Sequence, residues 1–335
     1  MDSKAPPTLA SIAERVGVSV NTVSRALRAP NTVRPQLRQR INAAIEELNY
    51  VPNRLAGGLS ATRSDIVGVV VASLYHSEFA SIVDALQAAL LTQNLQVMLA
   101  NTRYDPDQEE RLVRSVLSWR PVAVAIVGID HPAKVSVLLK AAGVPIVEMW
   151  DVGGPVIDSG VGFDHVAVGR AQAMHLIERG YRRLAFLGSL RDNDRRAYKR
   201  LQGVREAVSA AGLGEIAVAT MPHPGSPDLG EALATELLAQ SPEIDAIVCN
   251  SDVVAFGVLR ALRKLDRKVP SEVGVVGFGD NPASSCLTPS LTTIRPDREA
   301  IGRLSGEVVI ARLNGEEGRV CFADWSLVER ESTSS

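Results

Sequence analysis

Short polar side chains between residues 19 and 25 are the part of this sequence best suited to contact another molecule. Hydroxyl, amide and guanidinium groups follow one another there, and such groups hydrogen-bond to the base edges and phosphates of DNA. The side chains that a helix would turn outward are Val20, Asn21, Thr22, Ser24 and Arg25. This stretch therefore predicts a surface that reads DNA.

Two short helices joined by a tight turn would position these side chains. Gly17 lies where the turn needs a positive φ, and Ser19 lies where a hydroxyl can cap the second helix or meet DNA. Apolar residues recur at helical spacing on both sides of the turn; they are Leu9, Ile12, Ala13, Val16, Val23, Ala26 and Leu27. This pattern is typical of a helix-turn-helix, whose second helix enters the major groove. A small helical hairpin that packs against another element is the alternative.

A third helix is predicted from Pro35 onward, and three helices close together in sequence can enclose a small core. The segments ahead of the first and third helices carry side chains suited to phosphate contact, namely Thr8, Asn31, Thr32 and Arg34. Arg34 could equally be a solvated surface charge. These residues extend the predicted DNA-binding surface.

Charge is divided unequally along the chain. The net charge is −2, but residues 1–63 carry nine Lys/Arg and four Asp/Glu, whereas residues 64–335 carry 27 and 34. The basic N-terminal segment, residues 1–63, suits contact with phosphates, whereas the acidic remainder of the chain does not.

Length and cysteine usage narrow the class of protein further. A chain of 335 residues is too long for one compact domain. The cysteines at 249, 286 and 321 lie far apart without a CxxC pair, so we expect neither a disulfide framework nor a metal site. The sequence shows no leader-like segment and no bilayer-spanning apolar run. We expect a cytoplasmic, nucleoid-associated protein that makes no membrane contact.

Apolar runs alternate with helix-length segments from Ile66 onward. The expected strands span residues 66–72, 96–100, 123–127, 145–149, 184–188, 216–220, 245–249 and 273–278. The expected helices span residues 80–93, 107–119, 166–179, 195–211, 229–240 and 253–265, with another that ends near Ala142. Two such sets of units imply two doubly wound parallel sheets, with a ligand cleft between two lobes. The expected fold class is an all-α helix-turn-helix domain followed by this two-lobed α/β domain.

Two motifs resemble the lactose/galactose-repressor family of bacterial transcription regulators. The family's S-V-N-T-V-S-R sequence corresponds to residues 19–25, and its hinge has the form Y-x-P-N-x-x-A-x-x-L. The matching hinge residues are Tyr50, Pro52, Asn53, Ala56 and Leu59. The resemblance implies that the hinge folds on the operator and that Leu59 wedges into the minor groove. Glycines at 57 and 58 indicate that the hinge is disordered away from DNA, and a plain flexible linker is the alternative.

The resemblance extends over nearly the whole chain. Residues 99–110, 119–121 and 277–302 are similar to segments of the family's periplasmic-binding-protein-like sensor domain. We therefore divide the chain into a DNA-binding domain (1–51), a hinge and linker (52–63) and a sensor domain (64–335), with lobe crossovers near 160 and 290. The resemblance implies a palindromic operator and a homodimer, since one reading helix covers only a half-site.

The resemblance also implies contacts to a small effector in the cleft. Arg200 matches the family's R-x-x-G arginine, which would hold a carboxylate or sugar hydroxyls, although Arg200 also lies in a basic run. Asp252 matches the acid of the family's N-D-x-x-A-x-G motif and could instead cap a helix. Phe163 is a candidate stacking face or a core residue. The remaining candidates are Tyr75 and Phe79 after the first strand, and Asp280.

Residues 144–151, followed by V-G-F-D-H, resemble the gluconate-repressor branch of the family. That branch implies gluconate or a related sugar acid, and Glu148 and Asp151 would then meet its hydroxyls, because like charges repel. A neutral sugar, or an effector that promotes DNA binding, is the alternative. We expect a repressor that its effector releases from DNA.

Enzyme and transport functions fit the sequence less well. It contains no GxSxG elbow, no P-loop, no GxGxxG after a strand and no HExxH. We therefore expect no catalysis and no cofactor. A sugar-binding transport protein, the other alternative, would not need the basic segment of residues 1–63.

Overall fold

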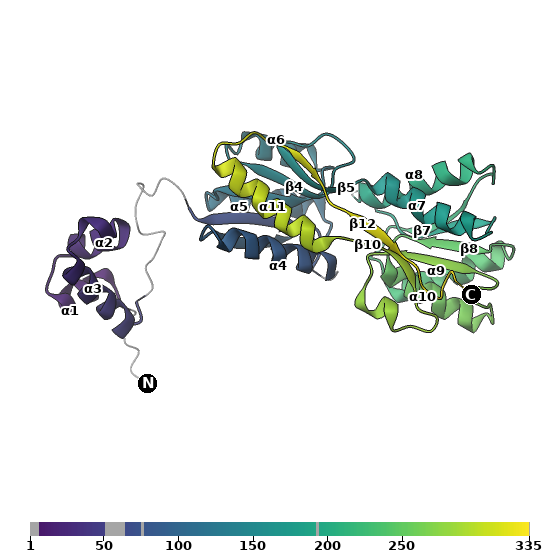
Figure 1. Ribbon diagram of the computed structural model, residues 1–335, viewed down its shortest axis with the longest axis horizontal. Helices are drawn as coiled ribbons and strands as arrows, with labels where there is room; N and C mark the ends of the chain where they lie inside the picture. Colours follow the sequence, from purple (N-terminus) through teal and green to yellow (C-terminus); the bar gives the residue numbers. More distant parts are fainter. Residues whose placement is uncertain (1–6, 51–63, 75–76, 192–193, 335) are drawn as a thin grey trace. The chain divides into compact units, whose positions relative to one another are not determined.

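The computed structural model describes residues 7–50, 64–74, 77–191 and 194–334 (Figure 1). The chain divides into two compact units, Met1–Thr62 and Arg63–Ser335. Each unit has its own buried core and is considered by itself.

The first unit is a small bundle of helices. It consists of α1 (Leu9–Val16), α2 (Val20–Arg28), the 3-10 helix η1 (Pro30–Thr32) and α3 (Pro35–Glu47). Gly17 ends α1 with φ 75°, and the Ser19 hydroxyl caps α2 by accepting from the Thr22 amide. The apolar residues predicted to face inward form its core. The predicted helix-turn-helix is therefore confirmed.

The second unit contains two sheets, and the first is entirely parallel. Its strand order is β11-β5-β4-β3-β1-β2. The strands are β1 (Ile66–Val71), β2 (Gln96–Asn101), β3 (Ala123–Val127), β4 (Ile146–Asp151), β5 (Ser159–Phe163) and β11 (Val320–Phe322). Its helices are α4 (Ser77–Leu91), α5 (Pro106–Ser118), α6 (Ala133–Ala141) and α11 (Arg298–Leu313).

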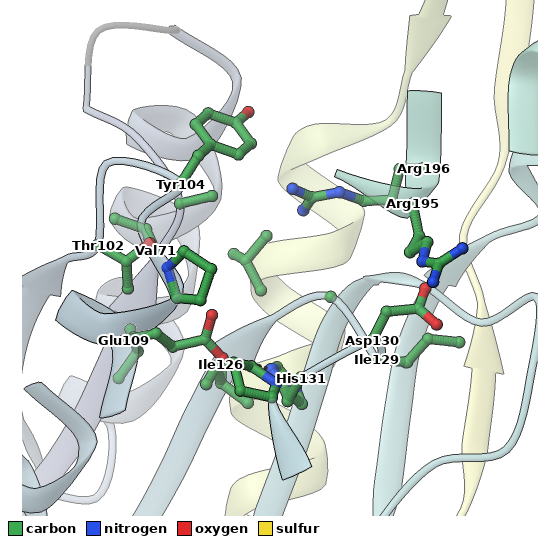
Figure 2. A pocket seen from close by; sticks show the side chains of 16 residues that line it. Val71, Thr102, Tyr104, Glu109, Ile126, Ile129, Asp130, His131, Arg195 and Arg196 are labelled. Carbon is green, nitrogen blue, oxygen red and sulfur yellow. Dashed lines mark hydrogen bonds and ion pairs between the residues drawn. The ribbon is translucent and has the colours of Figure 1, made fainter. Parts of the chain in front are cut away.

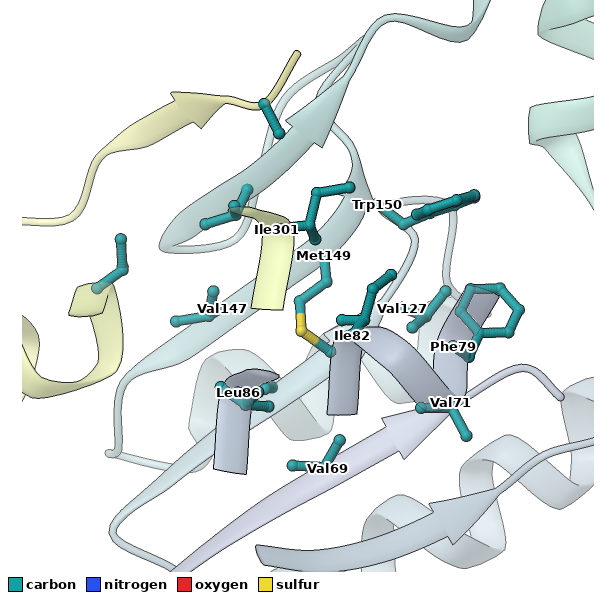
Figure 3. Close-up of a cluster of buried hydrophobic side chains, with 14 of the residues drawn as sticks. Val69, Val71, Phe79, Ile82, Leu86, Val127, Val147, Met149, Trp150 and Ile301 are labelled. Atoms are coloured by element: carbon teal, nitrogen blue, oxygen red, sulfur yellow. The ribbon is translucent and has the colours of Figure 1, made fainter. Parts of the chain in front are cut away.

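Both faces of the first sheet are covered. Val69 and Val71 pack with Ile82 of α4 and Ile301 of α11, as Figure 3 shows, while Val70 lies in the cluster with α5 and α6. This double coverage explains why the strands read as continuous apolar runs rather than as alternating patterns.

The second sheet has the strand order β12-β10-β9-β8-β6-β7. The strands are β6 (Leu184–Ser189), β7 (Ala217–Met221), β8 (Ala246–Cys249), β9 (Gly274–Phe278), β10 (Thr292–Pro296) and β12 (Trp325–Val328). Its helices are α7 (His165–Glu178), α8 (Arg195–Ala210), α9 (Pro227–Gln240), α10 (Asp252–Lys264) and the 3-10 helix η2 (Pro282–Ser285). The strands predicted from the sequence are parallel, and β12, which was not predicted, runs antiparallel to β10 at the edge of the sheet.

The chain passes between the sheets three times: after β5, after β10 and between β11 and β12. The last passage was not predicted, because β11 and β12 are too short to give a clear apolar pattern. The expected fold class, a helical domain followed by a two-sheet α/β domain, is confirmed. Among the described residues, no helix is both long enough and apolar enough to cross a membrane.

Candidate DNA-reading and effector sites

The second helix of the first unit presents an exposed reading surface. Val20 is 43% exposed, and Asn21 and Arg25 are also exposed. Thr22 and Ser24 are half-buried, and the Thr22 hydroxyl lies 2.9 Å from that of Ser19. Ser19 thus fixes the first turn of α2, and the side chains beyond it can reach base edges.

Several predicted phosphate contacts have local structural roles as well. Thr8 forms a capping box with Ser11, accepting from its amide at 3.3 Å. The Thr32 hydroxyl donates to the carbonyl of residue 29 at 2.7 Å. Asn31 in η1 and Arg34, which directly precedes α3, are exposed. Phosphate contact by these residues stays a prediction.

The hinge candidates fall mostly beyond the described structure. Tyr50 packs against the core of the first unit. Asn53, Ala56 and Leu59, and the effector candidate Tyr75, lie outside the described residues.

The second unit has a cavity of about 70 Å³ between its two lobes, which we call the inner cavity. Its walls come from α4 of the first lobe and from α8 and the ends of β8 and β9 of the second. The side chains used below are Glu78, Phe79, Asp194, Arg196, Arg200 and Asn250. The cavity lies at the carboxyl ends of strands, where ligands bind in such folds.

Close packing of α7 and α8 sets the position of Arg200. A Cβ atom on Gly203 would lie 2.0 Å from the Val166 carbonyl oxygen, and one on Gly169 would lie 1.9 Å from that of Arg200. Only glycine allows this approach. The R-x-x-G spacing therefore has a packing cause, because Gly203 brings the helix that carries Arg200 against α7.

Arg200 is buried and held from three sides. Its Nη1 donates to Nδ1 of His165 at 2.9 Å, and its Nη2 donates to the Asn250 carbonyl at 3.0 Å. The guanidinium lies 4.1 Å from the ring centroid of Phe278. Burial lowers the pKa of Arg200 to about 10, so it stays charged at neutral pH. Burial, with help from Arg200, lowers the pKa of His165 well below its usual value, and the neutral ring can accept this bond.

Four buried polar atoms of the inner cavity have no hydrogen-bond partner in the described part of the chain. Two are donors, Nη1 of Arg196 and Nε of Arg200. Two are acceptors, Oε2 of Glu78 and Oδ1 of Asn250. Buried polar atoms are rarely left unsatisfied in native proteins. All four belong to residues that line one cavity, which indicates a site for a ligand that carries an anionic group and hydroxyls.

Neighbouring groups fix these side chains. Asp194 accepts from Nε of Arg196 at 3.1 Å, and the Asn250 side-chain amide donates to the Ser189 carbonyl at 2.6 Å. Burial raises the pKa of Glu78, which favours its protonated form. The polar groups are therefore oriented before a ligand arrives.

Two of the predicted effector contacts line this cavity. Arg200 does so, and so does Phe79, whose ring centroid is 5.6 Å from that of Trp150. Phe163 does not line it, because its ring is buried 4.6 Å from that of His165 and 5.0 Å from that of Trp150. Phe163 is thus a core residue, which corrects its assignment as a stacking face.

The acidic candidates on β4 contact other protein groups, and their contact with an effector stays a prediction. Asp151 is fully buried and accepts from Nζ of Lys199 at 2.6 Å. Glu148 is fully buried, accepts from the Ile157 amide and lies 3.4 Å from Nε2 of His131. Neither residue lines the inner cavity, although Oε1 of Glu148 has no hydrogen-bond partner among the described residues.

Asp252 ties α10 to its surroundings rather than facing the cavity. It accepts from the hydroxyls of Thr293 at 2.6 Å and Ser284 at 2.7 Å, and from the Asn281 amide at 2.7 Å. It is not the cap of α10 either, because that position belongs to Ser251.

Asp280, the last acidic candidate, is paired with arginines. Its carboxylate accepts from Nε of Arg295 at 2.5 Å and from Nη2 of Arg330 at 2.7 Å. It therefore joins β10 to the C-terminal segment and does not line the inner cavity, and its contact with an effector stays a prediction.

Sequence reasoning missed Glu78, Asp194, Arg196 and Asn250 as cavity residues. Arg196 precedes Arg200 by one helical turn, and this spacing places both on one face of α8. Asn250 directly follows a buried strand, which is another usable signal. Glu78 gave no signal, because it comes from a distant part of the chain.

Comparison with known proteins identifies the family. Residues 8–53 match the bacterial regulatory proteins of the lacI family, and residues 173–333 match a periplasmic binding protein-like domain. The chain is 38% identical to the HTH-type transcriptional regulator GntR of Pseudomonas aeruginosa, over 98% of this chain and 96% of that protein. The chain belongs to the lacI family. It is therefore a DNA-binding transcriptional regulator and not an enzyme, as the sequence predicted.

Other lacI-family members extend this similarity. GntR of Escherichia coli is 32% identical over 93% of this chain and 94% of that protein. The crystal structure of a regulator from Silicibacter pomeroyi has a TM-score of 0.90 and 32% identity, over 98% of this chain and all of that one. The lac repressor dimer bound to operator has a TM-score of 0.83 and 26% identity, over 99% of this chain and 100% of that one.

Proposed function

We propose that this lacI-family regulator is a repressor that binds a palindromic operator as a homodimer and is released by a sugar acid, gluconate or a related aldonate. The observation that carries the proposal is the set of four unpartnered atoms in the inner cavity. An aldonate offers a carboxylate to the two guanidinium donors and hydroxyls to the two acceptors. The branch resemblance and the similarity to two GntR regulators support gluconate as the first candidate.

The charge of the inner cavity favours an anion over a neutral sugar. Three arginines line it, at 191, 196 and 200, against the carboxyl groups of Glu78 and Asp194. Burial raises the pKa of Glu78, which favours the neutral carboxylic acid. When Glu78 is protonated, the net charge of the cavity lining becomes more positive. A neutral sugar would leave the donor of Arg200 without an anionic partner.

Contacts from both lobes suggest how a ligand would be sensed. Glu78 belongs to α4 of the first lobe, and Arg196, Arg200 and Asn250 belong to the second. A ligand that binds all four holds the lobes in one relative orientation, and a difference in affinity between lobe orientations is what an effector needs to shift the DNA-binding equilibrium.

For the DNA side, we propose the division made from the sequence: a reading domain (1–51), a hinge (52–63) and a sensor (64–335). The exposed side chains of α2 would read base edges, and Thr8, Ser19, Asn31, Thr32 and Arg34 would contact phosphates. Two copies are required because one helix covers a half-site. The regulator would act in the cytoplasm, where its operator is.

Fluorescence anisotropy with DNA from the protein's own promoter region tests this function. We expect saturable binding that competes poorly with unrelated DNA and that gluconate reverses. If a neutral sugar reverses DNA binding and gluconate does not, the effector is a neutral sugar and not an aldonate. A ligand that strengthens DNA binding would overturn release as the mechanism.

A further inference from the structure

A second and larger cavity adjoins the inner cavity in the same unit. Its volume is about 510 Å³, against 70 Å³ for the inner cavity, and we call it the outer chamber (Figure 2). It lies at the carboxyl ends of β1, β2 and β3, and the first turn of α8 closes one side. Tyr104 and Arg196 line both spaces, so the two are adjacent.

The inner cavity is too small for a whole sugar acid. Pockets for small molecules usually measure roughly 300–1,000 Å³, and one water molecule needs about 10–15 Å³. The inner cavity therefore accommodates a carboxylate and a few further atoms. The chain of a sugar acid anchored at Arg200 would reach the boundary at Tyr104, and a further unit joined to that chain would lie in the outer chamber.

Tyr104 and Arg196 form the boundary between the two spaces. Figure 2 shows the Arg196 side chain extending toward Tyr104, and the guanidinium carbon lies 5.6 Å from the ring centroid. Arg191 lies 4.8 Å from the same ring. Burial raises the pKa of Tyr104 to about 12, so its phenol is neutral at physiological pH. This boundary is an aromatic face beside a cation, which suits a polyol chain that passes it.

Most charges around the outer chamber already have partners. Glu109 lies 2.7 Å from Nδ1 of His131, and Asp130 lies 3.2 Å from Nζ of Lys199. Arg196 is paired with Asp194 as described above. Apart from Arg195, the charged side chains described around the outer chamber are therefore already paired. Arg195 is exposed and lies at the start of α8.

The remaining walls suit an uncharged amphipathic group. Val71, Ile126 and Ile129 provide an apolar surface, and Thr102 adds a hydroxyl. Sugar rings have apolar faces edged by hydroxyls, and mostly apolar pockets with a few placed polar groups bind such molecules.

We infer that the outer chamber is a second subsite, which takes an uncharged glycosyl unit joined to an aldonate whose carboxylate is held in the inner cavity. The inference rests on the proposed function and specifies its ligand class as glycosyl aldonates. The carboxylate end would occupy the arginines, and the glycosyl end would pack on the apolar wall of the outer chamber.

Isothermal titration calorimetry of the full chain with gluconate and with 4-O-glucosyl-gluconate tests the inference without any substitution. We expect the glucosyl acid to bind at least about tenfold more tightly. If gluconate binds and the glucosyl acid binds no better, the inference is wrong while the proposed function stands. If neither acid binds, both are wrong.

The second measurement uses a bulky substitution that partly fills the outer chamber and compares the affinities of the two acids. Ile129→Trp adds bulk at the wall of the chamber but away from the inner cavity, and Val137→Trp on the exposed face of α6 is its matched control. We expect I129W to remove the advantage of the glucosyl acid while gluconate affinity stays within about threefold. V137W should behave as wild type. Equal loss for both acids in I129W, with V137W unaffected, would contradict a separate subsite.

Discussion

Arg200 and His165 form a buried pair in which a charged guanidinium donates to a neutral imidazole at 2.9 Å. No carboxylate forms an ion pair with Arg200 among the described residues, unlike Arg196, which is paired with Asp194. The positive charge of Arg200 therefore remains available to a ligand anion. His165 fixes the orientation of Arg200 without neutralising it.

Arg200→Lys should weaken gluconate binding while leaving operator binding unchanged. Lysine keeps the charge, but its donors all leave one nitrogen and cannot span the separate positions at which the guanidinium meets His165, the Asn250 carbonyl and a carboxylate. A charge-assisted hydrogen bond contributes about 1.5–3 kcal/mol, so we expect at least a tenfold loss of affinity. Calorimetry measures it, with Arg205→Lys on the exposed side of α8 as the control. Equal affinities for R200K and R205K would remove Arg200 from the site.

Arg25→Ala should abolish preference for the operator over unrelated DNA. Arg25 is exposed on α2, and a base contact by arginine contributes about 1–3 kcal/mol of discrimination. Anisotropy with specific and scrambled duplexes measures the ratio of affinities. Gluconate binding should be unchanged, since Arg25 lies in the other unit. If R25A weakens both duplexes equally, Arg25 contacts only phosphate.

Asp252→Ala should lower stability rather than act directly on the ligand. The substitution leaves the Thr293 and Ser284 hydroxyls and the Asn281 amide without their acceptor. Each unsatisfied buried group costs about 1–3 kcal/mol. Urea unfolding should show the loss in the second unit. A variant of normal stability that fails to bind gluconate would instead restore Asp252 as a ligand contact.

His131 should make stability fall as pH rises. Burial alone would lower its pKa, but Glu109 and Glu148 outweigh burial and raise the pKa from 6.5 to about 9. Because the folded pKa is above the unfolded one, this stabilisation is complete below pH 6.5 and is lost as pH rises through about 9.

His131→Gln should remove this component of the pH dependence. The measurement is the free energy of unfolding in urea at several pH values between 6.5 and 9. His175→Gln is the control, because burial lowers the pKa of His175 and its loss should not remove the effect. Parallel curves for wild type and H131Q would contradict the prediction.

The sequence determined the features that depend on neighbouring residues. Gly17 and Ser19 mark the turn and the cap of α2 by backbone conformation and a local hydrogen bond. The runs of buried strands and the helices between them follow from apolar periodicity alone. The family's R-x-x-G motif then identified Arg200. The glycine of that motif, Gly203, is required by the close packing of α8 on α7.

Only the tertiary structure decided which polar groups face the cavity. Asp151 and Asp252 lie at or near strand ends, as ligand contacts would, but each accepts hydrogen bonds from groups elsewhere in the chain. Glu78 enters the cavity from α4, far from Arg200 in sequence. Whether a buried carboxylate is satisfied depends on long-range packing, and local pattern carries no information about that packing.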